Sequence, residues 1–467
     1  MTRISSITVP KSRCLSRPGN ESRRISYGKA PRVLWTLCSS ATLGRSGWLI
    51  NCLSVIIKQS KRFTVMRFTS NPGHIDKQSL LVIGPTPPPY HGVSVAMKAI
   101  LESSLAIKFD LLHVDLADRR GIEHVDKPDL HDVVLFLKQW GRLISLLWLE
   151  RPAVAYLAIS QSTIGFLRDS FLMLPAWIAG AHVVLHLHGG NFKAWYESRS
   201  FLMRSYVRIV LRRVSYVAVL GESFRQLFDG LIASHRIAVV PNGIDWPAVQ
   251  KPAWDQHKLH RHRILHLSTL SRLKGALVLL AAIPTVLKIR QDVEFMLAGP
   301  WLNEEDRREA ESFIALHGLS GHVVFTGPVS TLEHKRSIYS SADLFVFPGL
   351  QQEGQPLVVL EAMASGLPVL FTDRGCLRDT VIEGECGLEV RSNDPQHLAD
   401  RLLWCFDRPE EVERMGRNAR EHFERFYTSE RLVLCLGDLF TLASGRCSPP
   451  SCLSSVPLVS QQKPGSR

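Results

Sequence analysis

The chain has 467 residues, 45% of them hydrophobic, which is enough to bury two cores and predicts two domains plus tails. Its net charge of +13 is concentrated near the ends, since Met1–Asn71 holds 13 Lys and Arg against the single acid Glu21. The centre is therefore close to neutral and has no interleaved aromatic and basic residues, which argues against a nucleic-acid-binding protein.

Neither disulfides nor metal ligands are indicated by the pattern of polar residues. The nine cysteines have no Cys-x-x-Cys or Cys/His ligand spacing, so a reducing, cytoplasmic compartment is favoured. There is no Asp-x-Asp motif, and we expect no metal or other cofactor. No apolar run reaches the 18 residues of a membrane span, and residues 47–57 form a weak membrane-surface element at most.

The two ends of the chain read as tails. Residues 1–76 are basic and rich in Ser, and we expect them to be disordered. The alternative is that part of this segment results from an upstream start codon, since clear strand patterns begin only after Met66. Residues 444–467 are rich in Ser and Pro and are expected to be disordered as well.

Between the tails, short apolar runs alternate with helical segments, the pattern of parallel βαβ units. The first set of predicted strands is SLLVIGP, FDLLHVDL, AVAYLAIS, HVVLHLHGG, YVAVLG and IAVVPNG. After a linker at 249–263, the second set is RILHLST, EFMLAGP, HVVFTGP, LFVFPG, PVLFTD and GLEV. The sequence thus predicts an α/β fold of two doubly wound, Rossmann-like domains, 77–248 and 264–427, facing across a cleft. A last helix at 428–443 is expected to pack back on the first domain.

Two strand ends in the first domain carry candidate site residues. The Pro-rich loop after the first strand leads to Gly92, which opens a helix and forms a backbone cradle for an anion. His188 ends the fourth strand, where an ordinary structural histidine is the alternative to a functional one. His186 is expected to lie in the interior. There is no Gly-x-Gly-x-x-Gly and no Walker motif.

A basic amphipathic helix is predicted between residues 192 and 214. Arg204, Arg208 and Arg212 are four residues apart and share one face. This face is either simply solvated or contacts an anionic membrane surface or the diphosphate of a lipid-linked acceptor.

The stretch 348–368, PGLQQEGQPLVVLEAMASGLP, places a loop and a helix directly after an apolar strand. Pro356 suits the first turn of a helix, whose N–H groups and positive dipole end attract a diphosphate. Gly354 lets the backbone approach that anion. On this interpretation Glu361 accepts hydrogen bonds from ribose hydroxyls and Glu353 faces the sugar; two surface acids beside an ordinary helix are the alternative.

The segment EGQPLVVLEAMASGLPVL resembles the signature of the retaining glycosyltransferases of family 4, which have the GT-B architecture. The resemblance extends from about Leu80 to Leu442. It implies that Glu353 and Glu361 contact the donor sugar and the nucleotide ribose. The family usually has an aromatic residue where Gln355 stands here, a change expected to affect sugar selectivity.

The segment RILHLSTLSRLKGALVLLAA resembles the first strand and helix of the family's C-terminal domain. Lys274 matches a family lysine expected to stabilise the leaving diphosphate, although a surface lysine capping a loop is the alternative. Ser268 and Thr269 replace the usual Gly-Arg, and Arg272 is the candidate for the missing guanidinium.

The family resemblance implies a retaining transfer of a sugar from a nucleotide-diphosphate sugar to a saccharide or lipid-linked acceptor. We expect this transfer to be metal-independent, because protein cations and the helix dipole can take the role of a metal. The alternatives are a related epimerase or phosphorylase, and a non-catalytic nucleotide-sugar-binding subunit. The predicted catalytic residues are Glu353, Lys274 and His188. The predicted donor-binding residues are Glu361, Arg272, Gly354, Gln355, Pro356, Leu357 and Gly92, with Thr326 and Gly327 beside the base.

Overall fold

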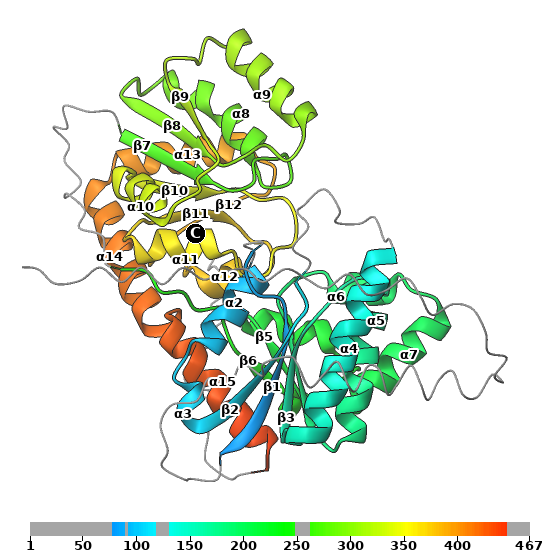
Figure 1. Cartoon of the computed structure of the whole chain (residues 1–467). Coiled ribbons are helices and arrows are strands. Elements are labelled where there is room, and N and C mark those ends of the chain that lie inside the picture. Colours follow the sequence, from blue (N-terminus) through cyan, green and yellow to red (C-terminus); the bar gives the residue numbers. More distant parts are fainter. Residues whose placement is uncertain (1–76, 89–91, 118–129, 248–261, 446–467) are drawn as a thin grey trace, which may run out of the picture. The chain divides into compact units, whose positions relative to one another are not determined.

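The computed structural model describes residues 77–88, 92–117, 130–247 and 262–445 (Figure 1). The predicted N-terminal tail, the start at Met66 and most of the linker lie outside the described residues. So does the predicted C-terminal tail, except for residues 444 and 445, which form a turn after α15 (Ser429–Ala443). The last two residues assigned to the linker, 262 and 263, instead belong to a strand.

The first half of the chain forms a six-stranded parallel sheet with the strand order β2-β1-β3-β4-β5-β6. Its strands are β1 (Gln78–Gly84), β2 (Phe109–Asp115), β3 (Val154–Ile159), β4 (His182–Leu187), β5 (Tyr216–Val219) and β6 (Ile237–Val239). The second half forms another parallel sheet, with the order β12-β11-β10-β7-β8-β9. Its strands are β7 (His262–Leu267), β8 (Val293–Ala298), β9 (Val323–Gly327), β10 (Leu344–Phe347), β11 (Val369–Thr372) and β12 (Gly387–Val390).

All twelve predicted strands are therefore confirmed, and with them the fold of two doubly wound domains. The strands read as continuous apolar runs because helices cover both faces of each sheet. Every residue of β10 and β11 is buried, for example.

Helices flank the first sheet on two sides (Figure 1). The helices of the first half are α2 (Gly92–Leu101), α3 (Leu105–Lys108), α4 (Leu130–Glu150), α5 (Thr163–Ile178), α6 (Phe192–Glu197), α7 (Phe201–Arg212) and the 3₁₀-helices η2 (Glu222–Phe228) and η3 (Ser234–Arg236). Side chains of α4 to α7 join one hydrophobic core, and those of α2, α3 and α15 join the core on the other face.

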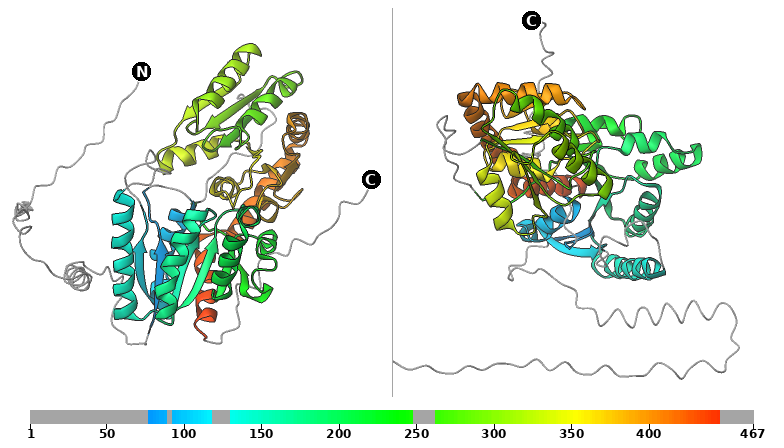
Figure 2. Two further views of the ribbon diagram at one scale, coloured as in Figure 1. Left: turned by 90° about the vertical axis from the view of Figure 1, so that its right-hand side faces the viewer. Right: turned by 90° about the horizontal axis from the view of Figure 1, so that it is seen from above.

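Helices also flank the second sheet, as the turned views show (Figure 2). These helices are α8 (Ala276–Leu287), α9 (Glu304–Leu316), α10 (Leu332–Ser341), α11 (Leu357–Ala364), α12 (Leu377–Thr380), α13 (Pro395–Phe406), α14 (Pro409–Phe426) and α15 (Ser429–Ala443). The last of them leaves the second half and buries Leu436, Leu439 and Phe440 against the first sheet.

Two observations concern the expected chemistry of the chain. Cys435 of α15 is disulfide-bonded, which the sequence did not predict, whereas Cys376, Cys386 and Cys405 are buried thiols. Among the residues described, no helix has the length and apolar character needed to cross a bilayer.

Candidate active site

The loop between β10 and α11 carries the predicted motif in the predicted setting. β10 ends at Phe347, and Pro356 is the N-cap of α11, so that Leu357 is the first helical residue. Proline is tolerated at this point because its missing N–H would have no partner within the helix. The helix ends at Ala364, and Gly366 follows with a positive φ of 69°. This strand–loop–helix arrangement points the N-terminus of α11 toward the loop that carries Glu353.

Glu353 is paired with Lys274 although 79 residues separate them in the sequence. The Nζ atom of Lys274 lies 2.5 Å from Oε1 of Glu353, and Gln351 donates to the same oxygen at 2.7 Å. Lys274 lies on the loop that follows β7, the neighbour of β10 in the sheet. Gly275 adopts φ of 88° there, and a Cβ on it would clash with the carbonyl of Pro348. The sheet order and this close approach bring the lysine to the carboxylate.

The end of β4 in the first domain packs directly on this loop. A Cβ on Gly354 would overlap the carbonyl oxygen of His188, and one on Gly190 would lie 2.8 Å from the carbonyl oxygen of Glu353. The three residues predicted as catalytic, His188, Lys274 and Glu353, therefore come from three strand ends that the fold brings together. Their roles stay a prediction.

His186 lies in the interior, as expected. Its Nδ1 accepts from the hydroxyl of Tyr156 at 2.7 Å, and its Nε2 donates to the carbonyl of Val240 at 3.1 Å, the tautomer that satisfies both partners. Burial lowers the pKa of His186 well below its usual value, and the neighbouring His188 adds to this effect. A neutral His186 supports the ring of His188, whose centroid is 4.1 Å away.

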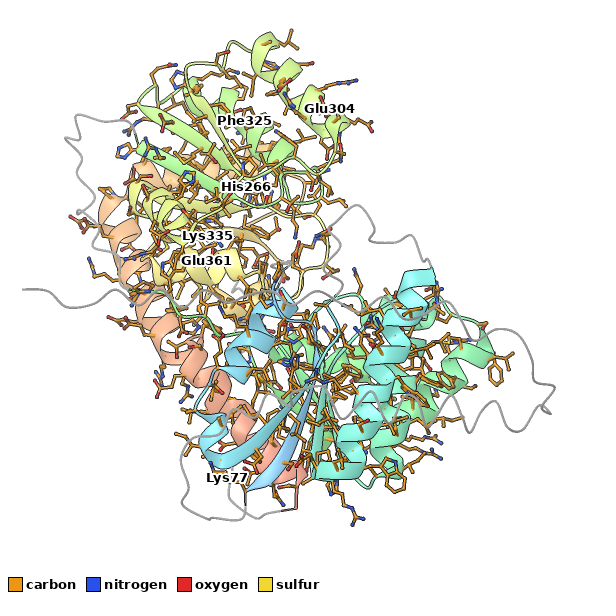
Figure 3. All side chains as sticks on the ribbon, in the orientation of Figure 1. Lys77, His266, Glu304, Phe325, Lys335 and Glu361 are labelled. Carbon is orange, nitrogen blue, oxygen red and sulfur yellow. The ribbon has the colours of Figure 1, made fainter. Side chains whose placement is uncertain are left out.

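Glu361 is buried on α11, and Figure 3 shows it beside Lys335. Lys335 of α10 forms a short ion pair with its Oε1, and the hydroxyl of Tyr339 donates to Oε2 at 2.9 Å. Burial raises the pKa of Glu361, against the lowering effects of Lys335 and Tyr339. A carboxylate held on one side by these donors keeps lone pairs for further hydroxyl groups.

Arg272 points away from the Lys274–Glu353 pair. Its guanidinium forms a short ion pair with Glu309 and lies 3.8 Å from Asp306, both on α9. Half of the side chain is exposed, at 52%. Binding a donor phosphate would require Arg272 to leave these acids, so its predicted role as a replacement cation has no support in this arrangement.

Gln355 is buried, and both polar atoms of its side chain are bonded to protein groups. Its Oε1 accepts from the backbone N–H of Asn242 at 2.7 Å, and its Nε2 donates to the hydroxyl of Thr380 at 3.0 Å. The amide side chain of Asn242 donates to the carbonyl of Gln355 at 3.1 Å. The prediction that Gln355 affects sugar selectivity therefore lacks a contact to carry it.

The remaining predicted donor-binding positions lie at strand and helix ends. Gly92 is the first residue of α2, and a Cβ there would have no neighbour within 4 Å among the described residues. Thr326 and Gly327 end β9, where Gly327 has φ of 68° and its carbonyl accepts from the N–H of Gly299. The carbonyl of Gly327 is thus engaged within the protein, and the predicted contacts of Gly92, Thr326 and Gly327 with a donor stay predictions.

The three arginines of the predicted basic helix lie on α7. Arg208 and Arg212 are exposed, Arg204 is partly buried, and Arg208 lies over the ring of Tyr196 at 6.0 Å. The same helix exposes Phe201, Leu202 and Ile209.

Sequence reasoning missed Lys335, Tyr339 and Gln351. Lys335 and Tyr339 are a helical turn apart on α10. Nothing in the sequence relates them to Glu361, which lies on α11, the helix that follows after strand β10. Gln351 is two residues from Glu353, and only the loop conformation turns it toward that carboxylate. Among the residues described, no group of three or more His, Cys, Asp or Glu is arranged to hold a metal ion.

Comparison with known proteins adds family information. The model of the family "Glycosyl transferases group 1" matches residues 252–422. The chain is 34% identical over 172 residues to D-inositol 3-phosphate glycosyltransferase of Corynebacterium kroppenstedtii, covering 36% of this chain and 38% of that protein. It is 31% identical over 166 residues to phosphatidyl-myo-inositol mannosyltransferase of Mycolicibacterium smegmatis, covering 35% and 41%. The chain thus spans about two fifths of the length of these relatives.

Solved structures agree on the fold. Anabaena HepE in complex with UDP is 19% identical, has a TM-score of 0.57 and covers 79% of this chain and all of its own, 100%. Sucrose-phosphate synthase from Thermosynechococcus elongatus is 16% identical, with a TM-score of 0.56 and coverage of 86% and 94%. At such identities the likeness concerns the fold alone. Residues 252–422 thus match the glycosyl transferases group 1 family model, and the chain shares with these solved structures the two-sheet fold that was predicted as GT-B.

Proposed function

We propose that the chain is a retaining glycosyltransferase that moves a sugar from a nucleotide-diphosphate sugar to a saccharide or lipid-linked acceptor. The observation that carries the proposal is the 2.5 Å pair of Lys274 and Glu353, which lies where the ends of β4, β7 and β10 meet. A cation beside a helix N-terminus suits a diphosphate, and a carboxylate beside them suits sugar hydroxyls. HepE was crystallised with UDP, and two relatives are named mannosyltransferases, which supports this substrate class.

In the proposed mechanism the bond from the anomeric carbon to the diphosphate breaks first, and the electron pair leaves with the phosphate oxygen. The ammonium of Lys274 and the N-terminus of α11 stabilise the charge that grows there. The acceptor oxygen attacks the oxocarbenium-like carbon from the same face, and its proton passes to the departing diphosphate. Glu353 holds the sugar, and Glu361 the ribose. We propose that this transfer needs no metal, because Lys274 and the helix end supply the positive charge.

Release of nucleoside diphosphate from a panel of UDP-, GDP- and ADP-sugars tests the proposal. One donor should be hydrolysed or transferred, and Lys274→Ala and Glu361→Ala should each lower the rate by about a hundredfold or more. Lys288→Ala changes an exposed lysine at the end of α8 and should leave the rate unchanged. Activity should also persist in EDTA.

Donor binding without any release, even with crude lipid acceptors added, would instead favour the second candidate, a non-catalytic nucleotide-sugar-binding subunit. The specific observation behind that candidate is the position of Arg272, whose ion pairs with α9 leave Lys274 as the one cation beside Glu353 among the described residues.

We further propose a cytoplasmic protein that contacts the inner face of the plasma membrane through α7. Exposed arginines and apolar side chains on one helix suit an anionic bilayer surface. Replacing Arg204, Arg208 and Arg212 by Ser should weaken binding to anionic liposomes and turnover of a lipid acceptor. The same Arg-to-Ser replacement at three exposed arginines of α9 and α14 should leave liposome binding and turnover unchanged. Unchanged liposome binding in the α7 variant would contradict the membrane contact. Cell fractionation tests the compartment. This second test is needed because Cys435 is disulfide-bonded, and disulfides are uncommon in a reducing cytoplasm.

A further inference from the structure

Gln355 connects the loop of the candidate active site to the segment that leaves the first domain. The residue is 5% exposed, and both polar atoms of its side-chain amide are engaged by protein groups. Thr380, which accepts from Nε2, donates its own hydroxyl proton to the carbonyl of Cys376. A buried amide is stable only when it is hydrogen-bonded, so these contacts fix the side chain in one orientation.

The partner of Oε1 is the backbone N–H of Asn242, which is itself buried. Asn242 lies three residues after the end of β6, in the stretch where the chain departs from the first sheet. Gly243 follows immediately, and a Cβ there would clash with the carbonyl of Thr428, just before α15 returns to the first sheet. The first connection between the domains therefore bonds to the amide of Gln355, and the second packs against Gly243, the residue after Asn242.

Along the chain, Gln355 is also flanked by residues of the candidate active site. Glu353 lies two residues earlier, and Gly354 between them packs on the carbonyl of His188. Pro356, the next residue, begins the helix that carries Glu361. Any displacement of Gln355 is thus transmitted over one or two peptide units to Glu353 and to the N-terminus of α11.

We propose that Gln355 is a positioning residue, which ties the Glu353 loop to Asn242 and so keeps the loop in register with the end of β4. It acts through Glu353 and not by touching the sugar. The inference rests on the proposed function for its kinetic consequence, whereas the tie between Gln355 and Asn242 can be measured without turnover.

The test compares full-length wild type with Gln355→Met, which keeps the length of the side chain and removes both hydrogen bonds. The kcat for the best donor should fall at least tenfold, while the ratio of kcat/KM between two donor sugars should stay within about twofold. The backbone N–H of Asn242 should exchange with deuterium at least tenfold faster, because its acceptor, Oε1 of Gln355, is gone. Gln396→Met alters an exposed glutamine of α13 and serves as the matched control.

Thr380→Val provides a second variant should Gln355→Met fail to fold. It removes the acceptor of Nε2 together with the hydroxyl's own hydrogen bond to the carbonyl of Cys376, and it leaves the bond from Asn242 to Oε1 of Gln355 in place. It should reproduce a smaller loss of kcat, again with donor preference unchanged. A changed sugar preference with kcat retained would overturn the proposal in favour of a direct sugar contact, and so would unchanged exchange at Asn242. If wild type released no diphosphate from any donor, the proposed function would fail, and faster exchange at Asn242 would still support the tie.

Discussion

Replacing Lys335 by Met removes the cation beside a buried carboxylate. The Lys335 side chain is 26% exposed and that of Glu361 is 9% exposed, so the pair lies between a surface ion pair and a fully buried one. Exposed pairs contribute about 0.2–1 kcal/mol, and breaking buried pairs costs about 3–5 kcal/mol. We therefore expect Lys335→Met to cost about 2 kcal/mol, which lowers the Tm by roughly 4–8 °C in a domain of this size.

The loss of stability caused by Lys335→Met should increase as the pH rises. Burial raises the folded-state pKa of Glu361 above its unfolded value, so its contribution to stability is fully present at low pH and falls as pH rises. Without Lys335 that pKa rises further, because the ion pair was one of the effects that lowered it. The deficit of Lys335→Met should thus be small near pH 4.5 and larger at pH 8.

Thermal and urea melts at the two pH values measure this deficit, with Lys288→Met as the exposed control. The double variant Lys335→Met, Glu361→Leu should recover most of the stability, because no unpaired charge remains and Tyr339 keeps the carbonyl of Val358 as an acceptor at 2.9 Å. A deficit that does not change with pH, or a double variant no more stable than the single one, would refute the reasoning.

Three further outcomes are expected. Burial lowers the pKa of His266 to about 4, so the neutral histidine contributes stability above pH 6.5. Urea melts should show this contribution being lost as pH falls toward 4, by up to about 1.4 kcal/mol per pH unit. A free energy of unfolding that stays constant across this range would contradict the prediction. Arg272→Gln should change kcat less than tenfold, since its guanidinium is paired with acids of α9, and a hundredfold loss in donor-release assays would show that it leaves them. Gly354→Ala should abolish most activity because its Cβ would overlap the carbonyl of His188, whereas Gly349→Ala, whose nearest neighbour would be 3.5 Å away, should be tolerated; equal effects of the two substitutions would be inconsistent with this packing.

The strands and the motif could be predicted because their signals are local. Apolar runs such as LFVF and VLFT identify strands covered on both faces, and they became β10 and β11. The order of strand, loop, Pro356 and helix is likewise contained in one short stretch, 344–368. Lys274 was identified through a resemblance in such a local segment, but its proximity to Glu353 was not predicted.

The orientation of side chains could not be predicted in the same way. Arg272 and Lys274 are two residues apart on one loop, yet one faces the acids of α9 and the other faces Glu353. Gln355 stands beside Glu353 in the motif, but its amide turns to Asn242 and Thr380. Sequence spacing cannot distinguish these outcomes, because each depends on groups 25 to 113 residues away.

The sequence by itself determined the two α/β domains and the loop-and-helix element that offers a helix N-terminus and two glutamates. These follow from hydrophobic pattern and backbone chemistry, which act over a few residues. Only the tertiary structure decided which cation pairs with which acid: Lys274 with Glu353, Lys335 with Glu361, and Arg272 with neither. The physical reason is that the strand order of each sheet, and not the order of the chain, decides which loop ends are neighbours, and a buried charge is stable only beside the partner that this arrangement supplies.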